Sequence, residues 1–213
     1  MDISKYIDYT LLSPTSTEHD IINLCINAVK NEYHAVCINS SHVSLAKKNL
    51  KDKSTKIATV VGFPLGATST EAKIFEAKKA IENGAHEIEM VVNLGYLKSE
   101  NYESVLQDIK AVKEIIKETP LKVIIEISEL SKTEIVQCCE ICLIAQAEYI
   151  KTSSGFSKKG ATFSAIKIIK KTIKNKAKII ASGNIRDLKT AEKYIKAGVH
   201  RVSFEADNPL NEI

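Results

Sequence analysis

Short apolar runs rich in β-branched residues alternate with longer amphipathic stretches from one end of the chain to the other. Runs of about four to eight such residues are typical of buried strands, and apolar residues spaced three and four apart are typical of helices. For example, Ile21, Leu24, Cys25 and Ala28 share one helical face. Eight strands are predicted, over residues 6–9, 35–38, 56–61, 87–92, 121–127, 149–152, 178–181 and 201–203. Helices are predicted over residues 18–31, 42–50, 70–83, 101–118, 132–147, 163–174 and 188–197.

This alternation of strands and helices is typical of α/β proteins, in which helices connect parallel strands. It predicts a (β/α)8 TIM barrel of the short form, as a single domain over residues 1–213. A doubly wound open sheet is the alternative, and strand counting does not exclude it. The glycine fingerprint of dinucleotide-binding folds is absent after the first strand, which favours the barrel. Helix signals agree, since Ser131 and Glu134 form a capping box and Gly84 and Gly198 stand where helices should end.

The charge pattern argues against a nucleic-acid partner. The formal net charge is +4, the only arginines are Arg186 and Arg201, and acidic residues are interspersed among the lysines. No apolar run approaches the roughly 18 residues of a membrane span, so no membrane association is expected. The five cysteines are an odd number without disulfide or metal-ligand spacing, which favours reduced thiols, a cytoplasmic location and no metal site.

Charged residues interrupt several predicted strands, and burying them is costly unless they are paired or functional. They are Glu87, Glu89, Glu126 and Lys151. Lys151 ends an apolar run directly before a small turn that contains Gly155, at the carboxyl end of a strand, where barrels carry their chemistry. A desolvated lysine in such a place can be the nucleophile that forms a Schiff base. The alternative is a surface lysine that simply ends a strand.

Glu87 and Glu89 lie on the same face of their predicted strand, because side chains alternate along a strand. If that face lines the barrel, two carboxylates share the interior with Lys151. This arrangement supports proton transfer beside an amine, and the alternative is a structural ion-pair network.

Motifs at the strand ends resemble those of the deoxyribose-phosphate aldolase family, in the family's order and over nearly the whole chain. The block Lys151-Thr152-Ser153-Ser154-Gly155-Phe156 and the turn Gly62-Phe63-Pro64 are the most specific of them. The others are Ile7-Asp8-Tyr9-Thr10-Leu11-Leu12, Val36-Cys37-Ile38-Asn39, Glu87-Ile88-Glu89-Met90-Val91-Val92-Asn93, Lys122-Val123-Ile124-Ile125-Glu126 and Ala181-Ser182-Gly183-Asn184-Ile185-Arg186.

The resemblance implies a (β/α)8 barrel and a Schiff-base lyase that uses neither a cofactor nor a metal. Such an enzyme reversibly cleaves 2-deoxyribose 5-phosphate to glyceraldehyde 3-phosphate and acetaldehyde. Carried over by motif, Lys151 is the imine-forming amine, and Glu89 and Asp8 complete the catalytic set. The residues implied to contact the substrate are Cys37, Gly155, Ser182, Gly183 and Asn184, with the backbone N–H of Gly155 directed toward the phosphate.

Three departures from the family pattern bear on the substrate. Glu89 stands where the family has an aspartate, and Ile180 stands where it has a second lysine. We expect apolar Ile180 to lower the pKa of Lys151 by desolvation, in place of the missing cation. Glu205 and Asp207 follow the last predicted strand, where the family has a small serine-bearing turn, and acidic side chains there would repel a phosphate.

The sequence therefore leaves three functions open. The first is a deoxyribose-phosphate aldolase that acts on a small-molecule sugar or aldehyde. The second is a barrel that has lost turnover and has a binding or regulatory role. The third is an imine-forming enzyme that acts on an unphosphorylated substrate. A homodimer is expected as the assembly.

Overall fold

The computed structural model describes residues 2–183, 185 and 187–206. Its strands are β1 (Ile7–Leu11), β2 (Ala35–Ile38), β3 (Lys56–Val61), β4 (Glu87–Val91), β5 (Leu121–Ile124), β6 (Tyr149–Lys151), β7 (Lys178–Ala181) and β8 (Arg201–Glu205). Its α-helices are α1 (Glu18–Lys30), α2 (Val43–Asn49), α3 (Thr70–Glu82), α4 (Leu94–Lys98), α5 (Tyr102–Ile116), α6 (Lys132–Ile144), α7 (Phe163–Ile173) and α8 (Leu188–Ala197). Short 3-10 turns are η1 (Ser4–Tyr6), η2 (Ser40–His42) and η3 (Ile127–Glu129).

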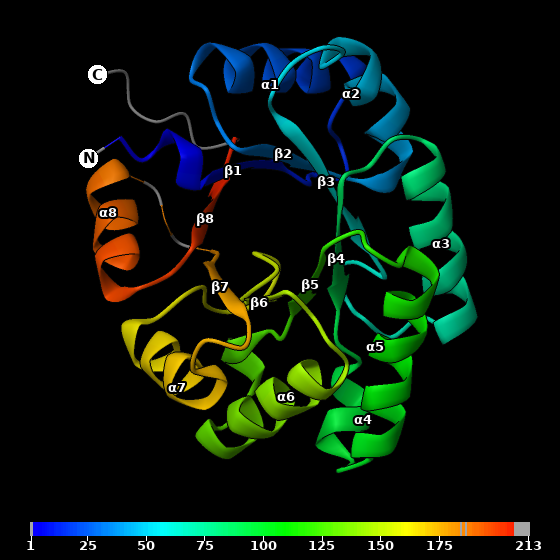
Figure 1. Cartoon of the computed structure of the whole chain (residues 1–213), viewed down its shortest axis with the longest axis vertical. Coiled ribbons are helices and arrows are strands. Elements are labelled where there is room, and N and C mark those ends of the chain that lie inside the picture. The colour runs from blue at the N-terminus through cyan, green and yellow to red at the C-terminus, as the bar shows by residue number, and fades with distance from the viewer. Residues whose placement is uncertain (1, 184, 186, 207–213) are drawn as a thin grey trace.

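The strands form a closed parallel barrel in chain order, and the helices cover its outside (Figure 1). The barrel closes where β1 pairs with β8, so that Asp8 stands opposite Ser203 and Thr10 opposite Glu205. This confirms the (β/α)8 barrel and excludes the open sheet. The carboxyl ends of all eight strands consequently meet at one end of the barrel.

The predicted elements exist, and the differences lie at their ends. β1 begins at Ile7 and reaches Leu11, because residues 4–6 form the turn η1. β5 ends at Ile124, three residues before its predicted end, since Glu126 adopts a left-handed backbone with φ of 54°. The helix α4 was not predicted, because five residues are too few for a helical period to show.

The main core lies between the barrel wall and the surrounding helices. From α5 it contains the fully buried Val105, Ile109 and Val112, which repeat at helical spacing. The capping box of Ser131 and Glu134 begins α6 as predicted. All five cysteines are buried and unpaired, in agreement with the prediction of reduced thiols.

One ion pair is buried in this helical layer. Lys73 of α3 lies 2.5 Å from Asp108 of α5, and both side chains are almost completely excluded from solvent. The amine also donates to the carbonyl of Val91, at the end of β4. Two helices and a strand are therefore joined by polar contacts within an apolar layer.

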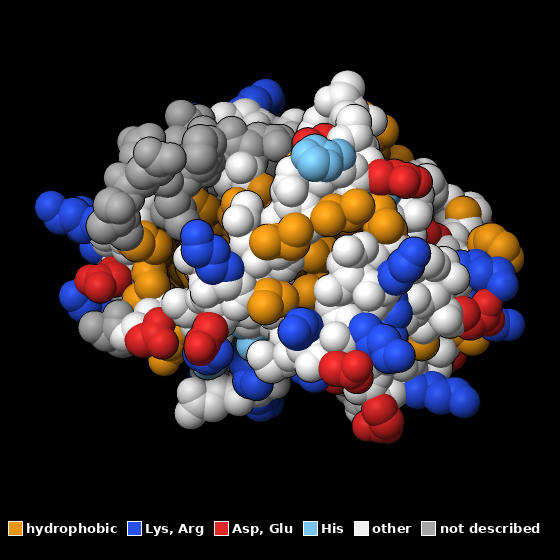
Figure 2. Space-filling view, turned by 90° about the horizontal axis from the view of Figure 1, so that it is seen from above, with side chains coloured by type: hydrophobic (Ala, Val, Ile, Leu, Met, Phe, Trp, Pro, Cys, Tyr) orange, Lys and Arg blue, Asp and Glu red, His pale blue; other side chains and the backbone are white. Residues whose placement is uncertain are grey.

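The side of the barrel that carries α1 and α2 shows a cluster of hydrophobic side chains between charged ones (Figure 2). On α1, Ile26 is 57% exposed. Within the described ranges, no helix has the length and apolar character needed to cross a membrane.

Candidate active site

Lys151 is the last residue of β6, and its side chain enters the barrel interior. It is 1% exposed, and in the barrel wall it stands between Ile124 of β5 and Ile180 of β7. Its Nζ lies 2.6 Å from Oε2 of Glu89, which comes from β4 and is fully buried. The surface-lysine alternative is therefore wrong, and the expected meeting of Lys151 with Glu89 is confirmed.

A second buried lysine, Lys122 of β5, connects this pair to the rest of the interior. Its Nζ lies 2.8 Å from Oε1 of Glu89, 2.7 Å from Glu87 and 3.0 Å from Asp8. Sequence reasoning missed its role, although Lys122 interrupts an apolar strand in the same way as Glu87 and Glu89. Glu89 thus bridges two ammonium groups, while Lys122 contacts three carboxylates.

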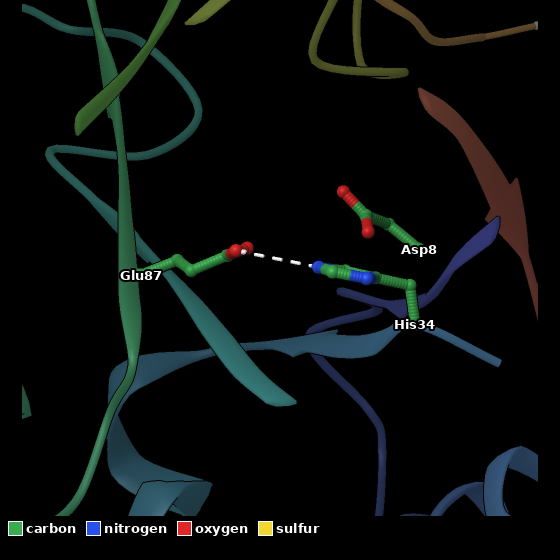
Figure 3. Close-up of side chains that lie close together, drawn as sticks. All are labelled: Asp8, His34 and Glu87. Atoms are coloured by element: carbon green, nitrogen blue, oxygen red, sulfur yellow. Dashed lines mark ion pairs between the residues drawn. The ribbon is translucent and has the colours of Figure 1, made fainter. Parts of the chain in front are cut away.

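Arg201 of β8 also belongs to this network of buried charges. Its guanidinium donates to Glu87 at 2.8 Å and to Asp8 at 3.1 Å. His34 points toward the same carboxylate of Glu87, with Nε2 3.6 Å from Oε1 (Figure 3).

Asp8, His34 and Glu87 bring possible ligand atoms within 4.8 Å of one another, which is a spacing that a metal ion could use. Lys122 and Arg201 already contact both carboxylates, however, and they supply the positive charge that a cation would bring. The group is therefore an ion-pair cluster, and its residues do not fit a metal centre.

Lys151 and Glu89 hold each other in their charged forms. Burial by itself would raise the pKa of Glu89, but the charges of Lys122 and Lys151 outweigh it and lower that pKa to about 2. Burial by itself would lower the pKa of Lys151, but the charge and hydrogen bond of Glu89 outweigh it and raise that pKa above its ordinary value. The expectation that Ile180 leaves Lys151 with a lowered pKa is thus wrong, because the negative charges and the hydrogen bond around the amine together outweigh its desolvation.

The turn after Lys151 is shaped by Glu126. One oxygen of its carboxylate, Oε2, accepts hydrogen bonds from both the backbone N–H and the hydroxyl of Ser154. The Ser154 hydroxyl in turn accepts the backbone N–H of Phe156 at 3.0 Å. Burial raises the pKa of Glu126, and its other oxygen has no hydrogen-bond partner among the described residues. Glu126 therefore holds the turn after Lys151 in place through Ser154. Its position in the sequence did not reveal this role.

A pocket of about 260 Å³ opens at the carboxyl end of the barrel beside this turn. Two of the predicted substrate contacts, Gly155 and Ser182, line it together with Glu205 at the end of β8. Its remaining lining residues are Thr10, Leu12, Ser13, Pro14, Ser154, Phe156 and Ser203.

Cys37 and Gly183 are not among the described residues that line this pocket. Cys37 is fully buried beside Leu12, Ala58 and Val60, and burial raises the pKa of its thiol well above the ordinary range. Gly183 packs against Gly160 so closely that an added Cβ would lie 2.8 Å from the Gly160 Cα. Asn184 and Asp207 lie outside the described residues. Substrate contacts from all five residues, Cys37, Gly155, Ser182, Gly183 and Asn184, stay predictions.

A closed barrel with a buried lysine and its carboxylate partner at the end of β6 defines the site of a Schiff-base enzyme. The family model described as DeoC/LacD family aldolase matches residues 3–200, and the chain belongs to this family.

Relatives with the name deoxyribose-phosphate aldolase match almost the whole chain. The one from Mycoplasmopsis pulmonis is 47% identical and covers all of this chain and 96% of its own length. The one from Mycoplasma capricolum is 46% identical and covers 94% of this chain and 90% of its own.

Among solved structures, the aldolase QR15 has a TM-score of 0.93 and 39% identity over 96% of this chain and 91% of its own. A tetrameric deoxyribose phosphate aldolase from Aeropyrum pernix has a TM-score of 0.88 and 27% identity, over 94% of this chain and 86% of its own.

Proposed function

We propose that this protein is a lyase, a class I aldolase that reversibly cleaves 2-deoxyribose 5-phosphate to glyceraldehyde 3-phosphate and acetaldehyde. The observation that carries the proposal is the buried Lys151 amine with a single carboxylate partner, Glu89, at 2.6 Å. The names and identities of the relatives support the choice of substrate.

The first step is the loss of a proton from the Lys151 ammonium, because only the free amine attacks a carbonyl. Glu89 is within hydrogen-bond distance and is the acceptor for this proton. The free amine adds to the aldehyde carbon of the open-chain sugar, and Glu89 then returns the proton to the hydroxyl group of this adduct. Water leaves, so that a protonated imine on Lys151 and a carboxylate on Glu89 remain. This cation stands where the ammonium stood, so the carboxylate of Glu89 stabilises it in the same way.

The protonated imine then accepts the electron pair of the bond between C2 and C3 of the sugar. The Glu89 carboxylate accepts the proton of the C3 hydroxyl, the three-carbon aldehyde leaves, and a neutral enamine remains on Lys151. Glu89 then gives this proton to C2 of the enamine, and addition of water to the resulting imine releases acetaldehyde and restores the Lys151 ammonium.

Lys122 is a positioning residue in this scheme. Without it, the buried Glu89 would face a single cation, and its pKa would rise as soon as the charge of Lys151 is lost. Because Lys122 contacts the other oxygen of Glu89, the carboxylate keeps one cationic partner through each change of charge at Lys151.

Reductive trapping tests the proposal. The protein is incubated with acetaldehyde and borohydride, digested, and its peptides are analysed by mass spectrometry. We expect an ethylated Lys151. Lys122 is a matched control within the same barrel, because its three carboxylates hold its ammonium more firmly and its pKa is raised well above the ordinary value. Absence of label on Lys151, or turnover that survives Lys151→Met, would refute the proposal.

A binding role without turnover is the second candidate, and the raised pKa of Lys151 favours it, since less free amine is present at neutral pH. Cleavage of 2-deoxyribose 5-phosphate that depends on Lys151 would exclude it.

We also propose that the protein works in the cytoplasm as a homodimer. The five unpaired cysteines support a reducing compartment. The hydrophobic side chains that gather over α1 and α2 support an interface between copies (Figure 2). Light scattering of the wild type and of Ile26→Lys tests the assembly, and a wild-type monomer would contradict it.

A further inference from the structure

The carboxylate of Glu205 forms part of the wall of the pocket beside the Lys151 turn. Glu205 is the last residue of β8 and pairs with Thr10 of β1, so the barrel wall fixes its backbone. Its Oε1 lies so close to Gly155 that a Cβ added to this glycine would be 2.9 Å away. Within the described part of the chain, no group donates a hydrogen bond to the Glu205 carboxylate or forms an ion pair with it.

The rest of the pocket offers hydroxyl groups and no positive charge. Among the described lining residues there is neither lysine nor arginine, and Glu205 is the only charged one. The hydroxyl-bearing residues are Thr10, Ser13, Ser154, Ser182 and Ser203. Hydroxyl groups and a carboxylate together suit a neutral ligand with several hydroxyl groups, since the carboxylate accepts a strong hydrogen bond from such a ligand.

The backbone of the turn is also poorly suited to a phosphate. Anion-binding turns present several successive free N–H groups. Here the N–H of Ser154 is donated to Glu126, and the N–H of Phe156 is donated to the Ser154 hydroxyl. Gly155 alone of these three residues keeps a free N–H, and the Glu205 carboxylate lies beside it.

We infer that Glu205 sets the substrate preference of this pocket in favour of unphosphorylated 2-deoxy sugars and hydroxyaldehydes over their phosphate esters. The inference rests on the proposed aldolase function and concerns the end of the substrate that is remote from the imine. A phosphate placed here meets a carboxylate without a compensating cation from the described lining residues, whereas a terminal hydroxyl donates to that carboxylate. The 5-phosphate is still cleaved, without the advantage that a basic phosphate site would give it.

The ratio of two specificity constants tests this inference. kcat/KM is measured for 2-deoxyribose 5-phosphate and for 2-deoxyribose with the wild type, with Glu205→Gln and with Glu192→Gln. We expect the wild type to cleave 2-deoxyribose with a kcat/KM at least equal to that for the phosphate. Glu205→Gln should raise the ratio of phosphate to sugar by at least about tenfold, because it removes the repulsion and keeps the shape.

Glu192→Gln is the matched control, since it removes the same charge from an exposed site on α8 that is outside the pocket. Its ratio should equal that of the wild type. A wild type that prefers the phosphate, or a Glu205→Gln ratio that rises no more than the control, would overturn the inference. If Glu205→Gln does not fold, salt provides the second readout, since screening must raise the wild-type ratio and a ratio that stays constant with salt overturns the inference.

The same measurements separate this inference from the proposed function. Absence of cleavage of both substrates, together with absence of a borohydride adduct on Lys151, would refute the aldolase function and the inference with it. Cleavage of both substrates with a clear preference for the phosphate would refute the role of Glu205 alone.

Discussion

Replacing Glu89 by glutamine should destabilise the protein strongly and in a pH-dependent way. The two oxygens of Glu89 lie 2.6 Å from Lys151 and 2.8 Å from Lys122, and all three side chains are buried. At these distances each pair attracts by about 6 kcal/mol for an effective dielectric constant of about 20. The desolvation of the charges offsets much of this attraction, so removal of one buried partner costs about 3–5 kcal/mol.

The cost is also smaller than the sum of both attractions because one of the two lysines keeps other carboxylate partners. Lys122 keeps Asp8 and Glu87 as partners, whereas Lys151 loses the one carboxylate that it contacts among the described residues. A loss of about 3–5 kcal/mol is roughly a fifth or more of the stability of an ordinary domain, and it corresponds to a fall in Tm of roughly 6–20 °C.

The pH dependence follows from the altered pKa values of both groups. The raised pKa of Lys151 stabilises the fold below the unfolded-state pKa of about 10.4, and this contribution is lost as the pH rises through the folded pKa. The pKa of Glu89, lowered to about 2, stabilises the fold above the unfolded-state pKa of about 4.3, and this contribution is lost as the pH falls through about 2. The difference between wild type and Glu89→Gln should therefore be largest between about pH 4.3 and 10.4 and shrink on both sides.

Urea unfolding at several pH values, monitored by circular dichroism, measures this difference. Glu192→Gln is the control for loss of a charge, and it should change the free energy of unfolding by less than about 0.5 kcal/mol. Equal stability of wild type and Glu89→Gln at pH 7, or a difference that does not vary with pH, would refute the reasoning.

Three further predictions concern the same charges and the helical layer. Because the pKa of Lys151 is raised, the rate at which borohydride traps the imine of Lys151 with acetaldehyde should increase about tenfold for each pH unit up to about pH 9. A rate that reaches a plateau below about pH 8 would contradict this prediction. Ile180→Lys places an ammonium beside Lys151 in the barrel wall, so it should lower the pKa of Lys151. We expect borohydride trapping at pH 7 to become about tenfold faster or more, and the free energy of urea unfolding to fall. An unchanged rate of trapping would contradict this prediction. Asp108→Ala should lower the free energy of unfolding by about 3–5 kcal/mol, because it leaves the buried Lys73 without its partner. The double variant Lys73→Met, Asp108→Leu should be as stable as the wild type or more stable. Equal stability of the two variants would contradict the burial of this ion pair.

The sequence was sufficient to find the strands and most of the charged residues of the site. Apolar runs and helical periods are local, so they are visible without knowledge of the fold, and the bounds differ by only a few residues. Glu89 and Lys151 stood out because a charge inside an apolar run is also a local feature. Lys122 interrupts β5 in the same way, so the same rule could have found it.

The contacts between these charged residues could not be predicted from the sequence. Glu89 and Lys151 are 62 positions apart, and Asp8 and Lys122 are 114 apart. Their contacts depend on the register of the strands and on closure of the barrel by β1 and β8. The same holds for Glu205, which lies beside Gly155 only because β8 and the turn after β6 meet at one end of the barrel.

The sequence by itself thus indicated the barrel through hydrophobic periodicity, and it indicated the proposed nucleophile through the motif around Lys151. Only the tertiary structure decided the proton state of Lys151 and showed that the Glu205 carboxylate lies beside Gly155 of the following turn. A pKa depends on the balance between burial and nearby charges. For Lys151 that balance is set by an oxygen of Glu89 at 2.6 Å, a distance that exists only once β4 and β6 share one interior.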